Sequence, residues 1–396
     1  KDNQRKLELA EPCLQGPWKS WRDSISKRAF RVMKVLRPFR TVASDLGRFF
    51  SDDRMIMATS FQSKYLGMSP YHCPSLFTIL AYIEYAHGVY HPIGGLGTMT
   101  KKMAQIAEEM GVRFHYNSPI EKVSIKNKEV NGILINGTKI PVNKIVMNAD
   151  FAHAMTSMVD NKHRKKWSNK KLEKSRYSCS TFMLYLGIDG KYDIPHHQIY
   201  VSSDYKGNLN DIEGGDVLTW NDPSFYIQNA SATDSSLAPD GCSTLYVLVP
   251  VGNTHGKINW SKEKHKFRDL ILNQLSNVGI KDIRNRIRSE TIITPDDWKG
   301  RGVYRGAVFN LAHNIGQMLH NRPRNRYEDI KGMYLVGGGT HPGSGLPVIM
   351  ESAKISSKLI CQDLGINPDW GNVSPWFPDQ KQPAHLDISR GNPSAQ

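Results

Sequence analysis

Apolar residues recur at helical spacing in some stretches of the chain and at strand spacing in others. The helical stretches are 40–92, 98–110 and 261–279. In the second of them, Met103, Ile106 and Met110 lie three and four positions apart, which predicts one apolar helix face. Alternating or continuous apolar runs predict strands at 112–116, 120–125, 144–148, 181–188, 198–202 and 244–250. The chain therefore belongs to the α/β class, with an α+β region between about 160 and 300.

Two Asn-Gly pairs punctuate the first group of strands, at Asn131-Gly132 and Asn136-Gly137. Both residues of such a pair accept the positive φ angles of a tight two-residue turn, so each pair predicts a β-hairpin. The run 144–148 reads Lys-Ile-Val-Met-Asn, which is typical of a buried parallel strand.

The segment from Met333 to Met350 carries the strongest chemical signal. A short apolar strand at 334–336 leads into a loop with five glycines, and Pro347 stands where a helix begins. Free N–H groups at such a loop and helix start bind an anion or a polarised ring oxygen. The segment therefore predicts a cofactor-binding loop, although a strict G-x-G-x-x-G motif occurs neither here nor at 94–97.

The 396-residue chain carries a formal net charge of +15. A positive charge of this size leads us to expect an acidic partner. Lys and Arg are densest in the first forty residues, where apolar and aromatic residues lie between them. This mixture predicts a basic amphipathic helix on a membrane surface, or else a solvated helix packed on its own domain. Nucleic-acid-binding motifs are missing from the sequence, so we expect no nucleic-acid partner.

Cysteine usage and hydropathy indicate the cellular compartment in which the protein is expected. The five cysteines are scattered and show no C-x-x-C pair, which argues against a disulfide framework and a metal site. No apolar run of about 18 residues is present, so no spanning helix is expected. We expect a cytoplasmic protein that is associated peripherally with the membrane.

Several segments, in order along the chain, resemble motifs of the carotenoid (phytoene-type) desaturases, which are FAD enzymes related to the amine oxidases. The segments are Tyr90–Gly97, Asn117–Val123, Val146–Asp150, Tyr177–Asp189, Ser236–Gly241, Thr291–Asp297 and Met333–Met350. The resemblance covers residues 15–365 and extends in particular to bacterial dehydrosqualene and phytoene desaturases.

The resemblance implies a Rossmann-like FAD-binding domain and a mixed helix–sheet substrate domain. It also leads us to expect an N-terminally truncated member, because the family's opening βαβ unit with G-x-G-x-x-G does not precede Lys1. The implied division is a helical, membrane-facing part (1–92), FAD-domain parts (93–160 and 301–365), a substrate domain (161–300) and an extended tail (366–396).

Residue roles carried over from the family are expectations too. The cofactor-binding candidates are Val123, Ala149, Asp150, Gly337, Gly338, Gly339, Thr340, Gly345, Leu346, Pro347 and Val348. The substrate candidates are Tyr90, Gly94 and Gly95. His341 is a candidate acid or base, with shaping of the loop as its alternative role.

The implied reaction is FAD-dependent desaturation of a carotenoid precursor such as phytoene or dehydrosqualene, with hydride passing to flavin N5. The expected partners are a long-chain isoprenoid substrate, a membrane surface, and a quinone or oxygen as electron acceptor. The alternatives are a carotenoid isomerase or oxygenase of the same family, or a non-catalytic, truncated remnant that binds membranes.

Overall fold

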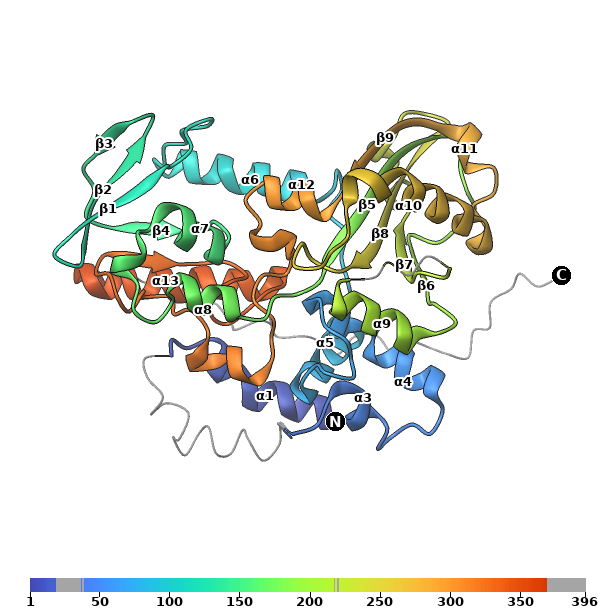
Figure 1. The fold of residues 1–396 in the computed structure, drawn as a ribbon, viewed down its shortest axis with the longest axis horizontal. Coiled ribbons are helices and arrows are strands. Elements are labelled where there is room, and N and C mark those ends of the chain that lie inside the picture. The colour runs from blue at the N-terminus through green and yellow to red at the C-terminus, as the bar shows by residue number, and fades with distance from the viewer. Residues whose placement is uncertain (19–36, 38, 217, 219–220, 369–396) are drawn as a thin grey trace.

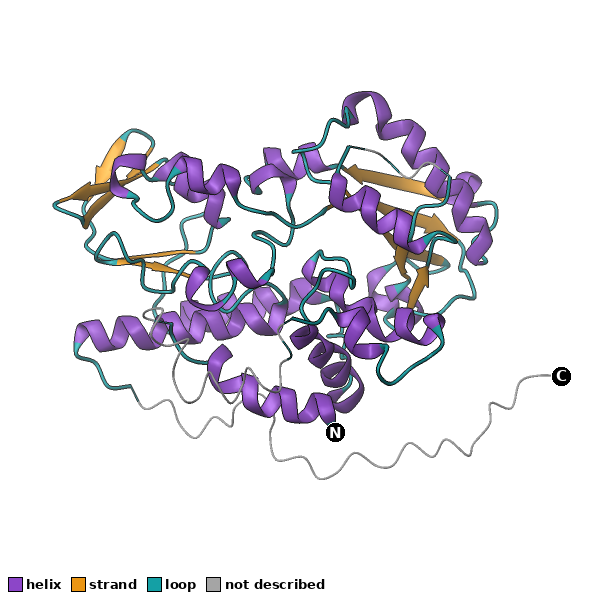
Figure 2. Cartoon of the chain, turned by 60° about the horizontal axis from the view of Figure 1, so that its bottom comes forward, coloured by secondary structure: helices purple, strands orange, loops and turns teal. Residues whose placement is uncertain are grey.

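The computed structural model describes residues 1–18, 37, 39–216, 218 and 221–368. Its strands form separate groups at two ends of the molecule, with helices between and below them (Figures 1 and 2). The basic amphipathic stretch at 19–36 and most of the predicted tail, 369–396, lie outside the described residues.

A five-stranded antiparallel sheet forms one end, in the order β6-β7-β8-β5-β9. Its strands are β5 Ser180–Asp189, β6 His197–Tyr200, β7 Phe225–Gln228, β8 Cys242–Val251 and β9 Ile287–Ile293. Alternate residues of β8 are buried, as expected for a strand with one face on a core. Helix α10 (Trp260–Gln274) packs on this face, where Trp260 and Phe267 contact Phe182 of β5. The strands predicted at 181–188 and 244–250 are thereby confirmed.

The other end contains a parallel pair and a small antiparallel sheet. In the parallel pair, β10 (Met333–Leu335) lies beside β4 (Ile145–Met147), which confirms the parallel strand predicted at 144–148. The antiparallel sheet consists of β1 Lys122–Lys126, β2 Glu129–Ile135 and β3 Thr138–Ile140. Helix α7 (Phe151–Met158) packs against both groups in one hydrophobic core.

Helices complete the structure, together with short 3₁₀ turns. The remaining helices are α1 Asp2–Leu14, α3 Val42–Leu46, α4 Asp53–Ser60, α5 Ile79–His87, α6 Leu96–Glu109, α8 Asn169–Lys174, α9 Tyr205–Gly214, α11 Ile283–Arg286, α12 Pro295–Gly300 and α13 Leu346–Leu364. The 3₁₀ turns are η2 Phe61–Leu66, η3 Ser75–Thr78, η4 Asn161–His163, η5 Ala230–Ala232, η6 Ser235–Leu237, η7 Leu275–Val278, η8 Tyr304–Gly306, η9 Ile315–Gln317 and η10 Leu319–Asn321. None of the helices in the described part of the chain is long and apolar enough to cross a membrane.

Two local predictions were wrong. The alternating run 112–116 forms no strand, because no described strand lies alongside to accept its hydrogen bonds, and Val112, Phe114 and Tyr116 are exposed. Asn131-Gly132 lies inside β2, whereas the turn between β1 and β2 falls at Asn127 and Lys128, both with positive φ. Asn136-Gly137 does form the turn between β2 and β3, as predicted.

A buried ion-pair network fixes α1 to the helical part of the fold. Lys6 of α1 donates hydrogen bonds to the carboxylate of Asp45 (2.5 Å) and to the hydroxyl of Thr78 (2.9 Å). Arg37 bridges Asp2 and Asp45, with both closest N–O distances at 2.9 Å. Burial alone would raise the pKa of Asp45, but the Lys6 and Arg37 cations outweigh it and lower that pKa.

We expect Asp45→Asn to lower the free energy of unfolding by about 3–5 kcal/mol, because it removes the buried carboxylate partner of Lys6 and leaves only Asp2, at 3.4 Å, to pair with this buried ammonium. Since the pKa of Asp45 is lowered in the folded state, its contribution is present above about pH 4 and is lost as pH falls through the folded value. Denaturant unfolding at pH 7 and pH 3 measures both effects. The matched control is Asp189→Asn in an exposed pair with Arg288, which should change stability by less than about 1 kcal/mol. Equal losses in the two variants would contradict the role of the network.

Candidate active site

The glycine loop, residues 336–345, joins β10 to α13 and presents free backbone N–H groups. Gly337 and Gly345 adopt φ angles of 97° and 107°, which side-chain-bearing residues rarely adopt. Among the described residues, none accepts a hydrogen bond from the N–H of Gly337, Gly338 or Gly339. Helix α13 begins after Gly345 without a side-chain cap, so its first N–H groups are free as well. The loop and helix start together form a backbone site for an anion or a polarised oxygen.

A fully buried cation, Arg322, holds this loop in place. Its guanidinium donates hydrogen bonds to carbonyl oxygens of the loop and of the segment 311–317. The accepting carbonyls belong to Gly338 (2.6 Å), Thr340 (3.1 Å), Leu311 (3.2 Å), Gln317 (3.4 Å) and Ala312 (3.5 Å). Within the described chain no carboxylate pairs with Arg322. Burial lowers its pKa to about 9, so the group stays charged at neutral pH.

The Arg322 contacts also set the direction of the loop's donors. In a trans peptide the carbonyl and the following N–H point in opposite directions. Because the Gly338 carbonyl points at Arg322, the N–H of Gly339 points away from it. One buried side chain thereby fixes the direction of a loop donor, away from the guanidinium.

Two buried histidines contact the same loop. His313 accepts a hydrogen bond from the Ser344 N–H at its Nε2 (3.0 Å), and burial holds the pKa of His313 well below its usual value. His341 hydrogen-bonds the Gly16 carbonyl through Nε2 (3.1 Å) and lies edge-on to Trp18. Burial lowers the pKa of His341 to about 3, so the ring is neutral near pH 7. These contacts favour the loop-shaping role of His341, and its acid–base role stays a prediction.

Of the other cofactor candidates, Ala149 and Asp150 lie close to the glycine loop, whereas Val123 lies in β1. A side chain on Gly339 would come within 2.7 Å of Phe151, and one on Gly337 within 2.9 Å of the Asn148 amide oxygen. The end of β4 therefore lies against the glycine loop and brings Ala149 and Asp150 to it. Asp150 caps α7 by accepting the His153 N–H (2.9 Å), and burial raises the Asp150 pKa. Val123 is buried in β1, in the core that also contains Phe151.

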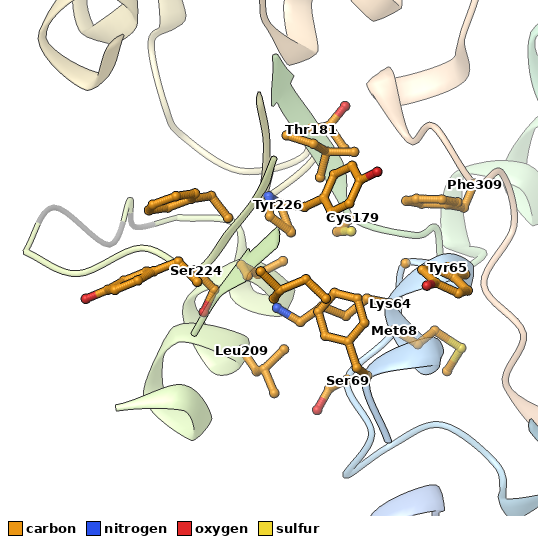
Figure 3. Close-up of a pocket in the computed structure, with 18 of the residues that line it drawn as sticks. Lys64, Tyr65, Met68, Ser69, Cys179, Thr181, Leu209, Ser224, Tyr226 and Phe309 are labelled. Carbon is orange, nitrogen blue, oxygen red and sulfur yellow. The ribbon is translucent and has the colours of Figure 1, made fainter. Parts of the chain in front are cut away.

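An apolar cavity of about 450 Å³ lies between the five-stranded sheet, α9 and the 61–69 segment (Figure 3). Phe61, Met68, Thr181, Tyr226 and Phe309 line it from segments far apart in the chain. The sequence predicted none of these residues, because each belongs to an ordinary apolar pattern and only the fold brings them together. The substrate candidates Tyr90, Gly94 and Gly95 do not line this cavity, although their neighbour Val89 does.

The cavity and the glycine loop share one short segment. Phe309 lines the cavity and donates its N–H to the Ser178 hydroxyl (3.1 Å). The next residue, Asn310, lies against the loop, since a side chain on Gly339 would meet the Asn310 amide oxygen at 2.8 Å. An apolar ligand in the cavity and a polar ligand on the loop would therefore be neighbours.

Residues 23–364 match the family model of the flavin containing amine oxidoreductases. The chain belongs to this family. It is 45% identical over 361 residues to a 4,4'-diapophytoene desaturase (4,4'-diapolycopene-forming) of Methylomonas sp, covering 90% of this chain and 70% of that protein. It is 40% identical to an all-trans-zeta-carotene desaturase of Myxococcus xanthus, covering 88% and 68% of the two chains. These matches confirm membership of the carotenoid desaturases, which are oxidoreductases.

Solved structures confirm the flavin-enzyme fold at lower sequence identity. An oxidoreductase from Methanosarcina mazei superposes with a TM-score of 0.57 at 15% identity, covering 87% of this chain and 73% of that one. A redesigned putrescine oxidase gives a TM-score of 0.52 at 12% identity, covering 91% and 75%.

The residues present fit the flavin that the family name implies. A flavin adenine dinucleotide presents phosphate and ring-carbonyl oxygens, and the free N–H groups of the glycine loop and the α13 start are matching donors. The absence of side chains at Gly337 and Gly339 lets the loop pack closely on Asn148, Phe151 and Asn310. We expect Gly337–Thr340 and Gly345–Val348 to hold the cofactor.

We expect Arg322→Met to lower the free energy of unfolding by about 3 kcal/mol or more, because it leaves several buried carbonyls without a donor. Arg322→Lys keeps a donor and the charge, so its loss should be smaller. Chemical denaturation measures both variants. Arg288→Met, in an exposed ion pair, is the control with a loss below about 1 kcal/mol. If the Arg322→Met and Arg288→Met variants were equally stable, the Arg322 guanidinium would not be what holds the loop.

Proposed function

We propose that the chain catalyses FAD-dependent desaturation of a linear carotenoid precursor, such as phytoene or 4,4'-diapophytoene. The observation that carries this proposal is the contact between an apolar cavity and a loop of free backbone donors through Phe309 and Asn310. A hydrocarbon substrate offers nothing for charged anchors to bind, so an apolar cavity is the site it requires. The names of the relatives at 45% and 40% identity support the same substrate class.

The bound flavin supplies the oxidant, since its N5 accepts a hydride from carbon. The chain's own residues position and enclose the reactants. The cavity side chains hold the hydrocarbon and exclude water, while the α13 start offers donors to the ring oxygen on which negative charge grows.

The finer partners are part of the proposal. A long polyene precursor dissolves in the bilayer, so we propose that the protein docks on a membrane surface to collect it. The net charge of +15 supports attraction to anionic lipid. We propose a quinone or oxygen as the final electron acceptor.

Product analysis tests the reaction. The purified chain, supplied with FAD, is incubated with phytoene or 4,4'-diapophytoene in liposomes, and the products are separated and weighed by mass spectrometry. Desaturation predicts loss of hydrogen in pairs and a red-shifted absorbance. An isomerase would leave the mass unchanged and an oxygenase would add oxygen, so either product would contradict the proposal.

Filling the cavity tests its role as the substrate site. Ile199 of β6 lines the cavity and is 41% exposed, so Ile199→Trp should fold normally while it narrows the space. We expect a higher KM or a roughly tenfold lower kcat/KM for the hydrocarbon, because bulk in the cavity displaces substrate atoms. Ile140→Trp is the matched control, since Ile140 is 42% exposed on β3 and lies outside the cavity. Unchanged kinetics in Ile199→Trp would place the substrate elsewhere.

A further inference from the structure

The cavity contains a lysine that no ion pair explains. Lys64 belongs to the 3₁₀ turn η2, and its side chain extends into the cavity (Figure 3). No described residue forms an ion pair or a side-chain hydrogen bond with its Nζ atom. Its Nζ atom lies over two ring faces, 4.9 Å from the centre of Tyr205 and 5.9 Å from that of Phe61. Lys64 is partly buried, and an ammonium with little access to water and no carboxylate partner is costly, so this placement requires a reason.

The acidic groups around the cavity are engaged elsewhere. The Glu84 carboxylate accepts a hydrogen bond from the Gln62 amide (2.8 Å), and the Glu213 carboxylate contacts the His72 ring (2.6 Å). The remaining titratable groups of the wall are Tyr65, Cys179, His197, Tyr200 and Tyr226. Burial raises the pKa of Cys179, Tyr65 and Tyr226 to about 12, so these three are uncharged near neutral pH. His197 hydrogen-bonds the Tyr226 hydroxyl (2.7 Å), and burial lowers the pKa of His197.

Lys64 is therefore a solitary amine in apolar surroundings. Burial lowers its pKa to about 8, so a fraction of the molecules carries the free amine at neutral pH. In that state Nζ has a lone pair, no competing hydrogen-bond partner among the described residues, and direct access to whatever fills the cavity.

We propose that the free amine of Lys64 is the base that accepts the substrate proton during desaturation. This inference rests on the proposed function. A flavin held by Gly337–Thr340 and Gly345–Val348 would take the hydrogen and both electrons of one C–H bond as hydride. The neighbouring C–H bond gives its proton to Nζ of Lys64, and its electron pair becomes the new C=C bond. Lys64 ends as an ammonium group and returns its proton to water before the next cycle.

The sign of the charge agrees with this role. As hydride leaves, positive charge grows on the hydrocarbon, and an ammonium ion beside it would oppose the reaction. A neutral amine does not, and it removes the charge by taking the proton. The rate should therefore follow the unprotonated form of Lys64 and rise with pH until about pH 8.

The first test measures the amine itself, independently of catalysis. Reductive methylation with formaldehyde, followed residue by residue with mass spectrometry from pH 6 to 11, gives the titration midpoint of each lysine. We expect a midpoint near 8 for Lys64. Lys206 is the internal control, because it also contacts a ring, Tyr71 at 5.6 Å, but is exposed on α9. A Lys64 midpoint no lower than that of Lys206 would overturn the proposal.

The second test compares variants in the desaturation assay. Lys64→Met keeps the length without a base, and Lys64→Arg keeps a cation that does not release its proton. Both should lower kcat by roughly 10²-fold or more with little change in KM, and both should lose the rise of rate with pH. Lys206→Met should keep the wild-type profile.

The outcomes separate the two proposals. Wild-type protein that forms no desaturated product at any pH contradicts the proposed function, while the methylation result still reports the state of Lys64. An active wild type whose Lys64→Met variant keeps kcat within a few-fold and keeps the rise with pH overturns the assignment of the base and leaves the function intact.

Discussion

The site depends on the hydrogen bonds between the Arg322 guanidinium and the backbone carbonyls around it. A planar group with five N–H donors can satisfy carbonyls from several directions at once, and here they come from the glycine loop and from the segment 311–317. The same contacts tie the loop to residues that directly follow Phe309 and Asn310 in the chain. A neutral side chain of this length would leave the loop donors without a fixed direction. The Arg322 guanidinium thus fixes both the geometry of the loop that would hold a flavin and the distance of this loop from the apolar cavity.

The molecule separates two kinds of recognition. Backbone N–H groups of the glycine loop are suited to a polar cofactor, and the apolar cavity is suited to a substrate without polar groups. Burial holds several titratable groups near these sites neutral, as His313, His341 and Cys179 show. In such surroundings an unpaired amine has a larger electrostatic effect on a neighbouring ligand than it would have in water, since few other charges lie near it.

Local patterns in the sequence predicted the structural elements that depend mainly on interactions between neighbouring residues. The strand–glycine–proline segment 334–347 folds as a strand, loop and helix, and its apolar run, its glycines and Pro347 mark these three parts in the sequence. The run 112–116 has the alternation of a strand but no strand beside it, so the pattern alone was insufficient. Arg322 and Lys64 looked like ordinary basic residues. Their importance comes from burial and from partners distant in the chain, which no spacing reveals.

The pairing of β10 with β4 has a consequence for assembly, because almost half of the chain lies between these two strands. Strands so far apart in sequence meet only after a large loop has closed, which makes their pairing slow relative to the hairpins of β1, β2 and β3. The glycine loop follows β10 directly, so it reaches its position against β4 only after this long loop has closed. A flavin that binds to this loop would therefore be captured late in folding.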